Sequence, residues 1–364
     1  MQSATLRIGF DVGSSLSKII YTINDGSPQF LMMEPDVVSL PATSIEHLSG
    51  SMARPENQAW VKLDRDSERI HVCGYLAKEF SAVERIEMLK YEYAFYKFLA
   101  AVGVIAANEK CDRLNIHAAM LLPYGEITSR EQLQAKITSA IKKYYFQNKL
   151  VRGRIASFQC HPESTGMVLK ILAQHGQDWF SSRRVVVLIF GYRNISCMSF
   201  NRGVLEAQHS ATSDLGFVNL IDKIIARTPG QNRYALTKAV YAIGSDLRTD
   251  HRELQSLIRS KQPENIQTEA KLLVNAIEAA RYEYWQLVQD WLNSVVPEIV
   301  DHLAVSGGTS AYLKSLLDQN LAWAKPEWMT APEGALPEDD PALQLRFADV
   351  IALFKSTFQT EVAA

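Results

Sequence analysis

Short apolar segments separated by polar turns dominate the first part of the chain. Residues 6–10 (LRIGF) and 18–23 (KIIYTI) predict two strands joined by the turn VGSSLS, and NDG at 24–26 is a strong hairpin signal. A polar stretch with Pro and Gly at 43–59 predicts a loop. Apolar runs on either side of it predict further short strands at 30–35, 37–41, 60–64 and 70–74.

Helical and strand-like patterns alternate over the next hundred or so residues. The pattern is helical from Leu76 to Asn108, and a second amphipathic helix is expected over Thr128–Asn148. Ser129 is the expected N-cap of that second helix, with Gln132 as its capping-box partner. The remaining segments predict a buried strand at 114–123, a strand running into a turn at 154–164 and a helix over Gly166–His175.

The strand–turn–strand pattern of residues 6–23 returns in the second half of the chain. Residues 183–211 predict a strand, a glycine-bearing turn, a second strand, an NRG hairpin turn and a third strand. This repetition suggests two related subdomains that face each other across a cleft. The rest predicts helices over 217–300, a strand, a glycine pair and a helix at 302–317, an acidic Pro-rich loop at 330–341 and a closing amphipathic helix at 345–358.

Bulk properties narrow the class of protein. With 364 residues, two domains are expected, because a single core rarely exceeds about 250–300 residues. The formal charge of −2 gives no global basic field for nucleic acid, and no apolar run approaches the roughly 20 residues that span a bilayer. No signal peptide is evident, so a cytoplasmic location is expected. The widely spaced cysteines are expected to be small, buried and apolar in a reducing compartment: Cys73, Cys111, Cys160 and Cys197.

The stretch FDVGSSLSK at 10–18 carries candidate phosphate chemistry. Backbone N–H groups in a tight Gly/Ser turn can converge on an anion, Lys18 can reach a phosphate, and Asp11 can hold a hydrated Mg²⁺. Taken alone, the stretch is also what an ordinary hairpin with a polar tip would show. The chain has no P-loop, dinucleotide-binding G-x-G-x-x-G, H-E-x-x-H or G-x-S-x-G motif, which removes several common enzyme classes.

Two further motifs have both a functional and a structural interpretation. VSGGTSAYL lets the backbone approach a ligand at Gly307 and Gly308, or is simply a tight strand-to-helix turn. Glu163 in HPESTG could orient a water for attack on a phosphate, or be a solvated turn residue. His161 beside it has no partner at metal-binding spacing and is interpreted as structural.

The order of these motifs resembles that of the actin-like ATPases, in the superfamily of actin, sugar kinases and heat-shock chaperones. FDVGSSLSK resembles their first phosphate loop, GYRNIS the second phosphate loop and VSGGTSAYL the adenosine motif. HPESTG, SDLGFVNLID and LRFADVIALFK, in that order, resemble the ParM-like bacterial and archaeal actins that segregate plasmids. The resemblance extends over essentially the whole chain.

The resemblance implies an α/β fold with two actin-like (ribonuclease H-like) domains and a nucleotide cleft between them. Domain I would comprise residues 1–175, with a variable small subdomain at about 33–95 and the helix 345–358 packing back onto it. Domain II would comprise residues 176–340. The implied cofactors are ATP or GTP, with Mg²⁺.

The resemblance also implies a role for each matching residue. Asp11 would hold Mg²⁺ and position the attacking water, and Glu163 would polarise that water. The first phosphate loop would contact phosphates through Gly13, Ser14, Ser15 and Lys18. Opposite it would lie Gly191, Tyr192, Arg193 and Asn194, with Asp214 and Gly216 lining the cleft, and with Gly307, Gly308 and Thr309 facing the ribose and adenine.

One departure from the family pattern affects the expected activity. The second phosphate loop of the family usually opens as D-x-G, whereas this chain has Ile189 two residues before Gly191. Either hydrolysis is retained, with reduced rate, through Asp11 and Glu163, or the protein binds nucleotide as a switch and barely hydrolyses it.

Three functions remain open at this stage. The leading hypothesis is an ATP-dependent filament of self-associating copies, in plasmid segregation or another cytomotive role. A DNA-binding adaptor would then be needed, since the chain has no nucleic-acid motif of its own. The alternatives are a non-polymerising nucleotide-binding scaffold with weak or no ATPase activity, and a metabolite kinase of the same fold.

Overall fold

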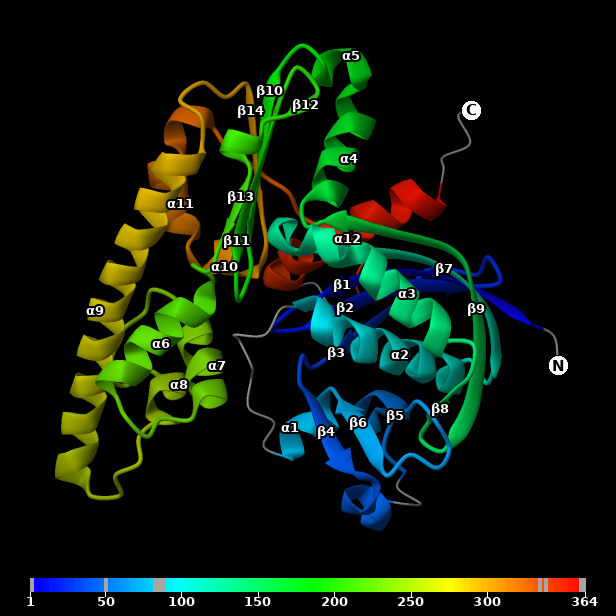
Figure 1. The fold of residues 1–364 in the computed structure, drawn as a ribbon. Helices are drawn as coiled ribbons and strands as arrows, with labels where there is room; N and C mark the ends of the chain where they lie inside the picture. The colour runs from blue at the N-terminus through cyan, green and yellow to red at the C-terminus, as the bar shows by residue number, and fades with distance from the viewer. Residues whose placement is uncertain (1–2, 49–51, 81–89, 333–335, 337–339, 360–364) are drawn as a thin grey trace. The chain divides into compact units, whose positions relative to one another are not determined.

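A computed structural model describes residues 3–48, 52–80, 90–332, 336 and 340–359 (Figure 1). The chain divides into two compact units. Unit 1 comprises Met1–Gln177 and Met329–Ala364, and unit 2 comprises Asp178–Trp328. Each unit has a sheet with helices around it, so the predicted α/β class is confirmed.

Unit 1 is built on a nine-stranded sheet. Strands β1 (Ala4–Val12), β2 (Ser17–Ile23) and β3 (Gln29–Met33) form consecutive antiparallel hairpins, and β7 (Arg113–Leu122) and β9 (Lys149–Pro162) continue the sheet parallel to β1. The order is β3-β2-β1-β7-β9 followed by β8 (Tyr144–Phe146), β5 (Trp60–Lys62), β6 (Arg69–Cys73) and β4 (Val37–Pro41).

Helices cover both faces of this sheet. The alternation of side chains along β1 sends Phe10 toward Phe98 of α2 (Lys90–Asn108), while Gly9 faces α12 (Pro341–Phe358). A Cβ atom at Gly9 would lie 3.2 Å from the Phe354 ring, so the small residue lets α12 pack against the strand. The other helices of this unit are η1 (Ala42–Leu48), η2 (Pro55–Gln58), α1 (Tyr75–Glu79), η3 (Tyr124–Ser129), α3 (Arg130–Ala140) and α4 (Thr165–His175).

Unit 2 repeats the central topology of unit 1. Its sheet has the order β12-β11-β10-β14-β15, in which β10 (Arg184–Phe190) pairs antiparallel with β11 (Ile195–Asn201) and parallel with β14 (His302–Ser306). The same relations join β1 to β2 and to β7. The remaining strands are β12 (Val204–Leu205), β13 (Ala211–Ser213), which pairs with β11, and β15 (Glu327–Trp328).

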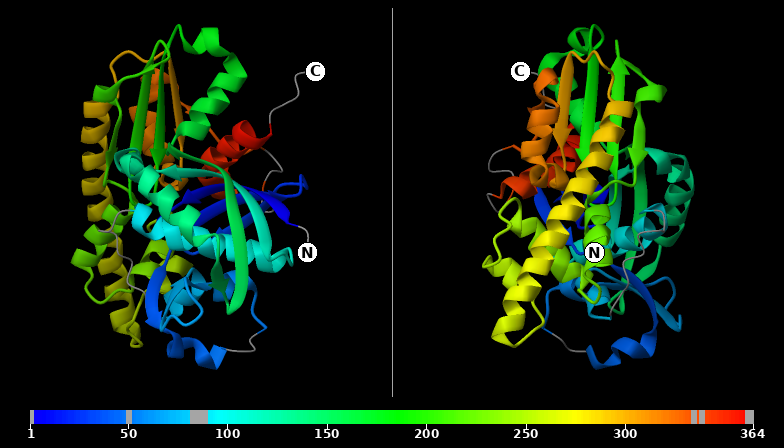
Figure 2. Two further views of the ribbon diagram at one scale, coloured as in Figure 1. Left: turned by 45° about the vertical axis from the view of Figure 1, so that its right-hand side comes forward. Right: turned by 90° about the vertical axis from the view of Figure 1, so that its left-hand side faces the viewer.

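The long helix α9 (Pro263–Val295) runs beside the sheet of unit 2, where its buried side chains share a core with β10 (Figure 2). The helical region predicted over 217–300 is confirmed. The other helices are α5 (Gln177–Phe180), at the junction of the two units, η4 (Ala207–His209), α6 (Phe217–Arg227), α7 (Arg233–Ile243), α8 (Arg252–Gln255), α10 (Gly308–Tyr312), α11 (Lys314–Asn320) and η5 (Ala322–Ala324).

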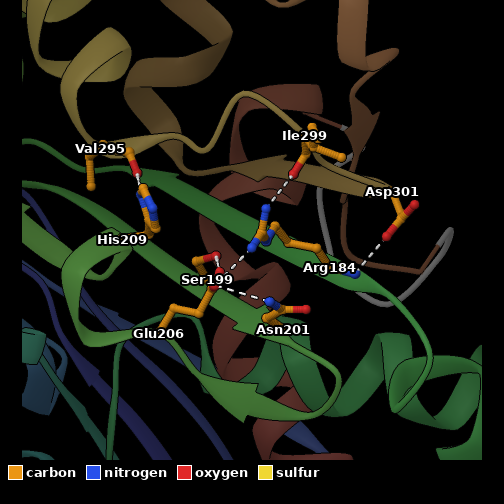
Figure 3. A network of polar contacts seen from close by, with 8 residues as sticks. All are labelled: Arg184, Ser199, Asn201, Glu206, His209, Val295, Ile299 and Asp301. Atoms are coloured by element: carbon orange, nitrogen blue, oxygen red, sulfur yellow. Dashed lines mark hydrogen bonds and ion pairs between the residues drawn. The ribbon is translucent and has the colours of Figure 1, made fainter.

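A polar network closes the end of the unit 2 sheet where β10 begins (Figure 3). The Glu206 carboxylate accepts hydrogen bonds from Arg184 Nη2 at 3.0 Å, Ser199 Oγ at 2.8 Å and Asn201 Nδ2 at 3.2 Å. The Arg184 backbone N–H donates to Asp301 Oδ2 at 2.7 Å. The network therefore joins β10, β11 and the segment before β14 at the end of β10 remote from Gly191.

Several local predictions need correction. The helix expected over Thr128–Asn148 ends at Ala140, and the chain then forms a hairpin of β8 and β9. Gln147 and Asn148 both have positive φ (47° and 64°), the conformation of a tight hairpin turn, and the Tyr144 and Phe146 side chains of β8 are buried. The Ser129 side chain makes no capping hydrogen bond within the described residues.

Other predictions are confirmed only in part. The expected loop at 43–59 contains the short helices η1 and η2. The helix expected over Leu76–Asn108 is present as α1 and α2, while 81–89 lie outside the described residues, as does much of 330–341. Cysteines 73 and 197 are buried, whereas 111 and 160 are half-buried. The closing helix is present as α12.

Candidate functional site

The hairpin β1–β2 brings Asp11 and Lys18 together. The last paired residues are Val12 and Ser17, so the connecting loop is Gly13–Leu16, and Asp11 lies directly opposite Lys18 in the register. The Lys18 ammonium forms an ion pair with the Asp11 carboxylate, and the two side chains are only 14% and 9% exposed. The predicted metal ligand and the predicted phosphate contact are therefore adjacent.

The loop itself has a geometry that requires glycine at its first position. The Gly13 N–H donates to the Asp11 carbonyl at 2.9 Å, and a Cβ atom at Gly13 would lie only 2.1 Å from the Leu16 carbonyl oxygen. Two cations from other helices contact the loop: Lys97 Nζ of α2 donates to the Gly13 carbonyl at 3.3 Å, and Arg346 Nη2 of α12 donates to Ser15 Oγ at 3.0 Å. Neither cation was expected at the loop, since both lie far from it along the chain.

Glu163 lies at the same edge of the sheet as Asp11. Strands β1, β7 and β9 are parallel and end at Val12, Leu122 and Pro162, and the carboxyl ends of parallel strands are the common ligand-binding edge of such sheets. The Glu163 N–H donates to the Leu122 carbonyl at 2.7 Å, and its side chain is largely buried. Asp11, near the end of β1, and Glu163, directly after the end of β9, are thus held in unit 1 with β7 between their strands.

A buried carboxylate that sequence analysis did not identify lies beside these two. Asp349 on α12 accepts hydrogen bonds from the Ser164 N–H at 2.8 Å and the Met167 N–H at 3.2 Å. Burial raises the pKa of the Asp349 carboxyl to about 7; the hydrogen bond from Ser164 opposes this shift, and the charges of Asp11 and Glu163 add to it. Asp349 therefore lies close enough to Asp11 and Glu163 for their charges to interact, and Asp11 is itself paired with Lys18.

The loop between β10 and β11 is the counterpart in unit 2. The last paired residues are Phe190 and Ile195, which leaves Gly191–Asn194 as a loop of the same length as Gly13–Leu16. In this alignment Ile189 occupies the position of Asp11, and Ser196, which pairs with Ile189, occupies that of Lys18. The unit 2 loop thus lacks both charges of the unit 1 loop.

The carbonyl groups of this second loop are already hydrogen-bonded within unit 2. The first turn of α6 donates to them, from Phe217 N–H to Gly191 at 3.3 Å and from Val218 N–H to Tyr192 at 2.8 Å. Thr309 Oγ1 also donates to the Gly191 carbonyl at 2.8 Å, and Thr309 is buried. Gly216 permits this docking, because a Cβ atom there would lie 2.2 Å from the carbonyl carbon of Arg193.

Asp214 is an exposed carboxylate attached to the same loop. Its Oδ1 accepts a hydrogen bond from Asn194 Nδ2 at 2.8 Å. Of the predicted site residues in unit 2, Asp214 is the one that offers a carboxylate near the loop.

An aromatic cluster supports the turn at Gly307 and Gly308. Gly307 has φ of 99°, and a Cβ atom there would lie 2.4 Å from the Phe190 carbonyl oxygen, so only glycine is accommodated. Tyr241 Oη donates to the Gly308 carbonyl at 2.9 Å, and its ring stacks near Tyr312 with a centroid distance of 6.1 Å. Sequence analysis identified the glycines but not these aromatic residues.

The donor set suits magnesium better than a metal held by protein ligands alone. No group of three or more His, Cys, Asp or Glu side chains is arranged to hold a metal ion within the residues that the structure describes. Mg²⁺ is usually held by one or two carboxylates together with substrate phosphates, and Asp11 beside a Gly/Ser loop offers this arrangement.

Of the helices described, none is sufficiently long and apolar to cross a membrane.

Comparison with known proteins identifies the fold. No protein-family model matches the chain, and no curated protein matches it in sequence. Among solved structures, a ParM filament from Clostridium botulinum has 15% identity and a TM-score of 0.64, covering 99% of this chain and 100% of that one. ParM of Bacillus thuringiensis with ATP has 15% identity and a TM-score of 0.61, over 98% and 99% of the two chains.

An archaeal actin homologue also matches, with 14% identity and a TM-score of 0.59, over 98% of this chain and 100% of that one. These likenesses extend over nearly the whole of each chain. The resemblance predicted from the order of the motifs is confirmed at the level of the fold: the chain has the two-domain actin-like fold of the ParM type.

Proposed function

We propose that this protein binds ATP together with Mg²⁺ and assembles into filaments of identical copies under control of the bound nucleotide. The observation that carries the proposal is the Asp11–Lys18 ion pair beside the loop Gly13–Leu16, with Glu163 at the same sheet edge. The similarity to a ParM filament and to a ParM with ATP supports the same function.

Each residue of unit 1 has a chemical role in this proposal. Lys18 leaves its pairing with Asp11 to contact a phosphate, while the Gly13, Ser14 and Ser15 backbone follows the phosphate oxygens. When bound, Mg²⁺ neutralises phosphate charge, and Asp11 would hold it. Glu163 accepts a hydrogen bond from the attacking water and orients it toward the terminal phosphate.

In this proposal the residues of unit 2 bind the nucleotide and do not take part directly in its hydrolysis. Gly191, Tyr192, Arg193 and Asn194 would approach the phosphates, and the turn at Gly307, Gly308 and Thr309 would approach the ribose and adenine. Since Ile189 stands where the first loop has Asp11, hydrolysis rests on unit 1 and is expected to be slow. GTP is the alternative nucleotide.

The biological role follows from assembly. Heterologous contacts that do not close into a ring give open filaments, which can move a cargo as they grow. We propose plasmid or other DNA segregation in the cytoplasm, through a DNA-binding adaptor, since the net charge of −2 gives the chain no general affinity for DNA.

Calorimetry and phosphate release test the nucleotide part of the proposal. We expect ATP binding that depends on Mg²⁺, and about a 100-fold lower hydrolysis rate in Glu163→Gln with little change in affinity. Glu131→Gln, which makes the same change of charge on the exposed surface of α3, serves as the control and should behave as wild type. Equal hydrolysis rates in Glu163→Gln and wild type would exclude the proposed role of Glu163.

A non-polymerising nucleotide-binding scaffold is the second candidate, and the isoleucine at 189 favours it. That function predicts tight ATP binding without turnover and without polymer. Sedimentation at increasing protein concentration, with and without ATP and Mg²⁺, separates the two: pelleted polymer supports the filament, and its absence alongside measurable ATP binding supports the scaffold.

A further inference from the structure

We propose that Asp349 is a positioning residue for Glu163: its carboxylate, supplied by α12, fixes the turn that carries Glu163 at the end of β9. This inference deepens the proposed ATP hydrolysis and rests on it. Asp349 lies 186 residues from Glu163 in sequence, and α12 brings it to the turn.

The hydrogen bonds hold the turn on both sides of the Glu163 peptide. The Glu163 N–H donates to the Leu122 carbonyl at 2.7 Å, and the next N–H, of Ser164, donates to Asp349 Oδ2 at 2.8 Å. Two consecutive backbone N–H groups are thus bonded to different elements. The orientation of the Glu163 backbone is fixed by β7 on one side and by α12 on the other.

Asp349 also supplies the capping carboxylate that an N-cap side chain would normally provide to α4. Ser164 is the N-cap residue, but it adopts a left-handed conformation with φ of 84°, and its hydroxyl has no hydrogen-bond partner within the described residues. Asp349 Oδ1 instead accepts from Met167 N–H at 3.2 Å, the third residue of α4. Strain of this kind persists only where the surroundings impose it, as the carboxylate does here.

The packing between α12 and α4 leaves Asp349 no freedom. A Cβ atom at Gly166 would lie 2.0 Å from the Asp349 backbone carbonyl oxygen and 2.7 Å from its Oδ1, so the two helices meet at the closest distance that glycine allows. Neighbouring residues of α12, including Phe347 and Val350, are fully buried in the core of unit 1. Any displacement of the turn relative to the sheet would therefore break contacts along α12.

The two possible roles of Asp349, as a purely structural cap or as a positioning residue, predict different effects of its replacement. A structural cap contributes to stability and leaves the rate per folded molecule unchanged. A positioning residue acts through Glu163, so its replacement lowers kcat when Glu163 is present and has no further effect when Glu163 is absent. Misplacement of a catalytic group by about 1 Å can lower a rate about 100-fold.

The test compares Asp349→Asn with Asp340→Asn in the full chain at pH 8. Asp340 is the matched control, because it caps α12 through its own carboxylate, accepting from Ala342 N–H at 2.8 Å, and is exposed. We expect Asp349→Asn to lower kcat about 10- to 100-fold with the ATP dissociation constant within about twofold, and Asp340→Asn to change neither. In a Glu163→Gln background, Asp349→Asn should change kcat by less than about twofold.

Equal losses of kcat from Asp349→Asn in both backgrounds, or an unchanged kcat, would overturn the proposal. Asp349→Ser, which has a smaller side chain, is the second variant if Asp349→Asn folds poorly, and the same outcomes apply to it. Amide hydrogen exchange in nucleotide-free protein gives a readout independent of activity: Ser164 and Met167 should exchange faster in the Asp349 variant only. If wild type binds no ATP, the proposed function fails, and unchanged exchange would separately overturn the positioning of the turn.

Discussion

Replacing Asp349 by asparagine is expected to change how the stability of the protein depends on pH. The folded state holds the pKa of this carboxyl at about 7 against an ordinary value of 3.8, chiefly because the group is buried, and also because Asp11 and Glu163 lie near it. A raised pKa in the folded state means that folding binds a proton between these two values. The contribution of Asp349 to stability is therefore greatest below pH 3.8 and is lost as the pH rises through 7.

The size of the effect follows from the shift. About three pKa units at 1.36 kcal/mol each give about 4 kcal/mol over the full window, and about 2–3 kcal/mol between pH 5 and pH 8. Asparagine does not titrate in this range. The difference in unfolding free energy between wild type and Asp349→Asn should therefore move by about 2–3 kcal/mol, in favour of the variant, from pH 5 to pH 8.

Urea denaturation of both proteins at several pH values, without nucleotide or magnesium, measures this difference. Asp340→Asn serves again as the control and should show no such trend, since its carboxylate is exposed. A difference between wild type and Asp349→Asn that stays constant within about 0.5 kcal/mol from pH 5 to pH 8 would refute the burial argument.

Three further predictions address other parts of the structure. Glu206→Ala should lower the unfolding free energy by about 1–3 kcal/mol in urea denaturation, because it removes the carboxylate that pairs with the Arg184 guanidinium. Burial acts to raise the Glu206 pKa, but hydrogen bonds from Ser199 and Arg184 outweigh it and lower that pKa, so the loss of stability should shrink as the pH falls through the acid range; a loss that stays constant with pH would count against this argument. Gly13→Ala should weaken ATP binding in calorimetry at least about tenfold, because its Cβ would collide with the Leu16 carbonyl oxygen, and unaltered affinity would contradict this geometry. Tyr241→Phe should destabilise the folded protein by about 1 kcal/mol in thermal unfolding, through loss of its bond to the Gly308 carbonyl; no shift of the melting temperature would show that this bond contributes nothing.

Local sequence patterns were sufficient to predict the elements that carry the site. The strands around Gly13 and around Gly191 were predicted from apolar runs bounded by turn residues, because each hairpin is closed by residues adjacent in sequence. The hairpin of β8 and β9 was missed, since Gln147 and Asn148 adopt positive φ without a glycine to indicate the turn. Burial of Tyr144 and Phe146 in β8 outweighed the helical pattern that precedes them.

Contacts between distant segments could not be predicted in this way. Asp349 lies in an amphipathic helix whose apolar pattern was recognised, but its partners are the N–H groups of another helix. Lys97 and Arg346 likewise reach the Gly13–Leu16 loop only because α2 and α12 pack on opposite faces of the sheet. Such residues have no local signature, since their chemistry depends on which helix packs where.

The repeated topology shows which residue of the first loop Ile189 corresponds to. The two hairpin loops have the same length and register, so Ile189 is the structural counterpart of Asp11 rather than the result of a shifted alignment. Unit 1 retains a carboxylate, a lysine and Glu163, whereas the unit 2 loop has no charge at the two corresponding positions. We therefore expect slow hydrolysis that depends on the residues of unit 1.

Electron microscopy of the purified full chain with ATP and Mg²⁺ is the decisive test of nucleotide-dependent assembly. We expect filaments in the presence of ATP and Mg²⁺, and far fewer when nucleotide is omitted. The absence of filaments with ATP or GTP, at concentrations where calorimetry shows the nucleotide to be bound, would contradict it.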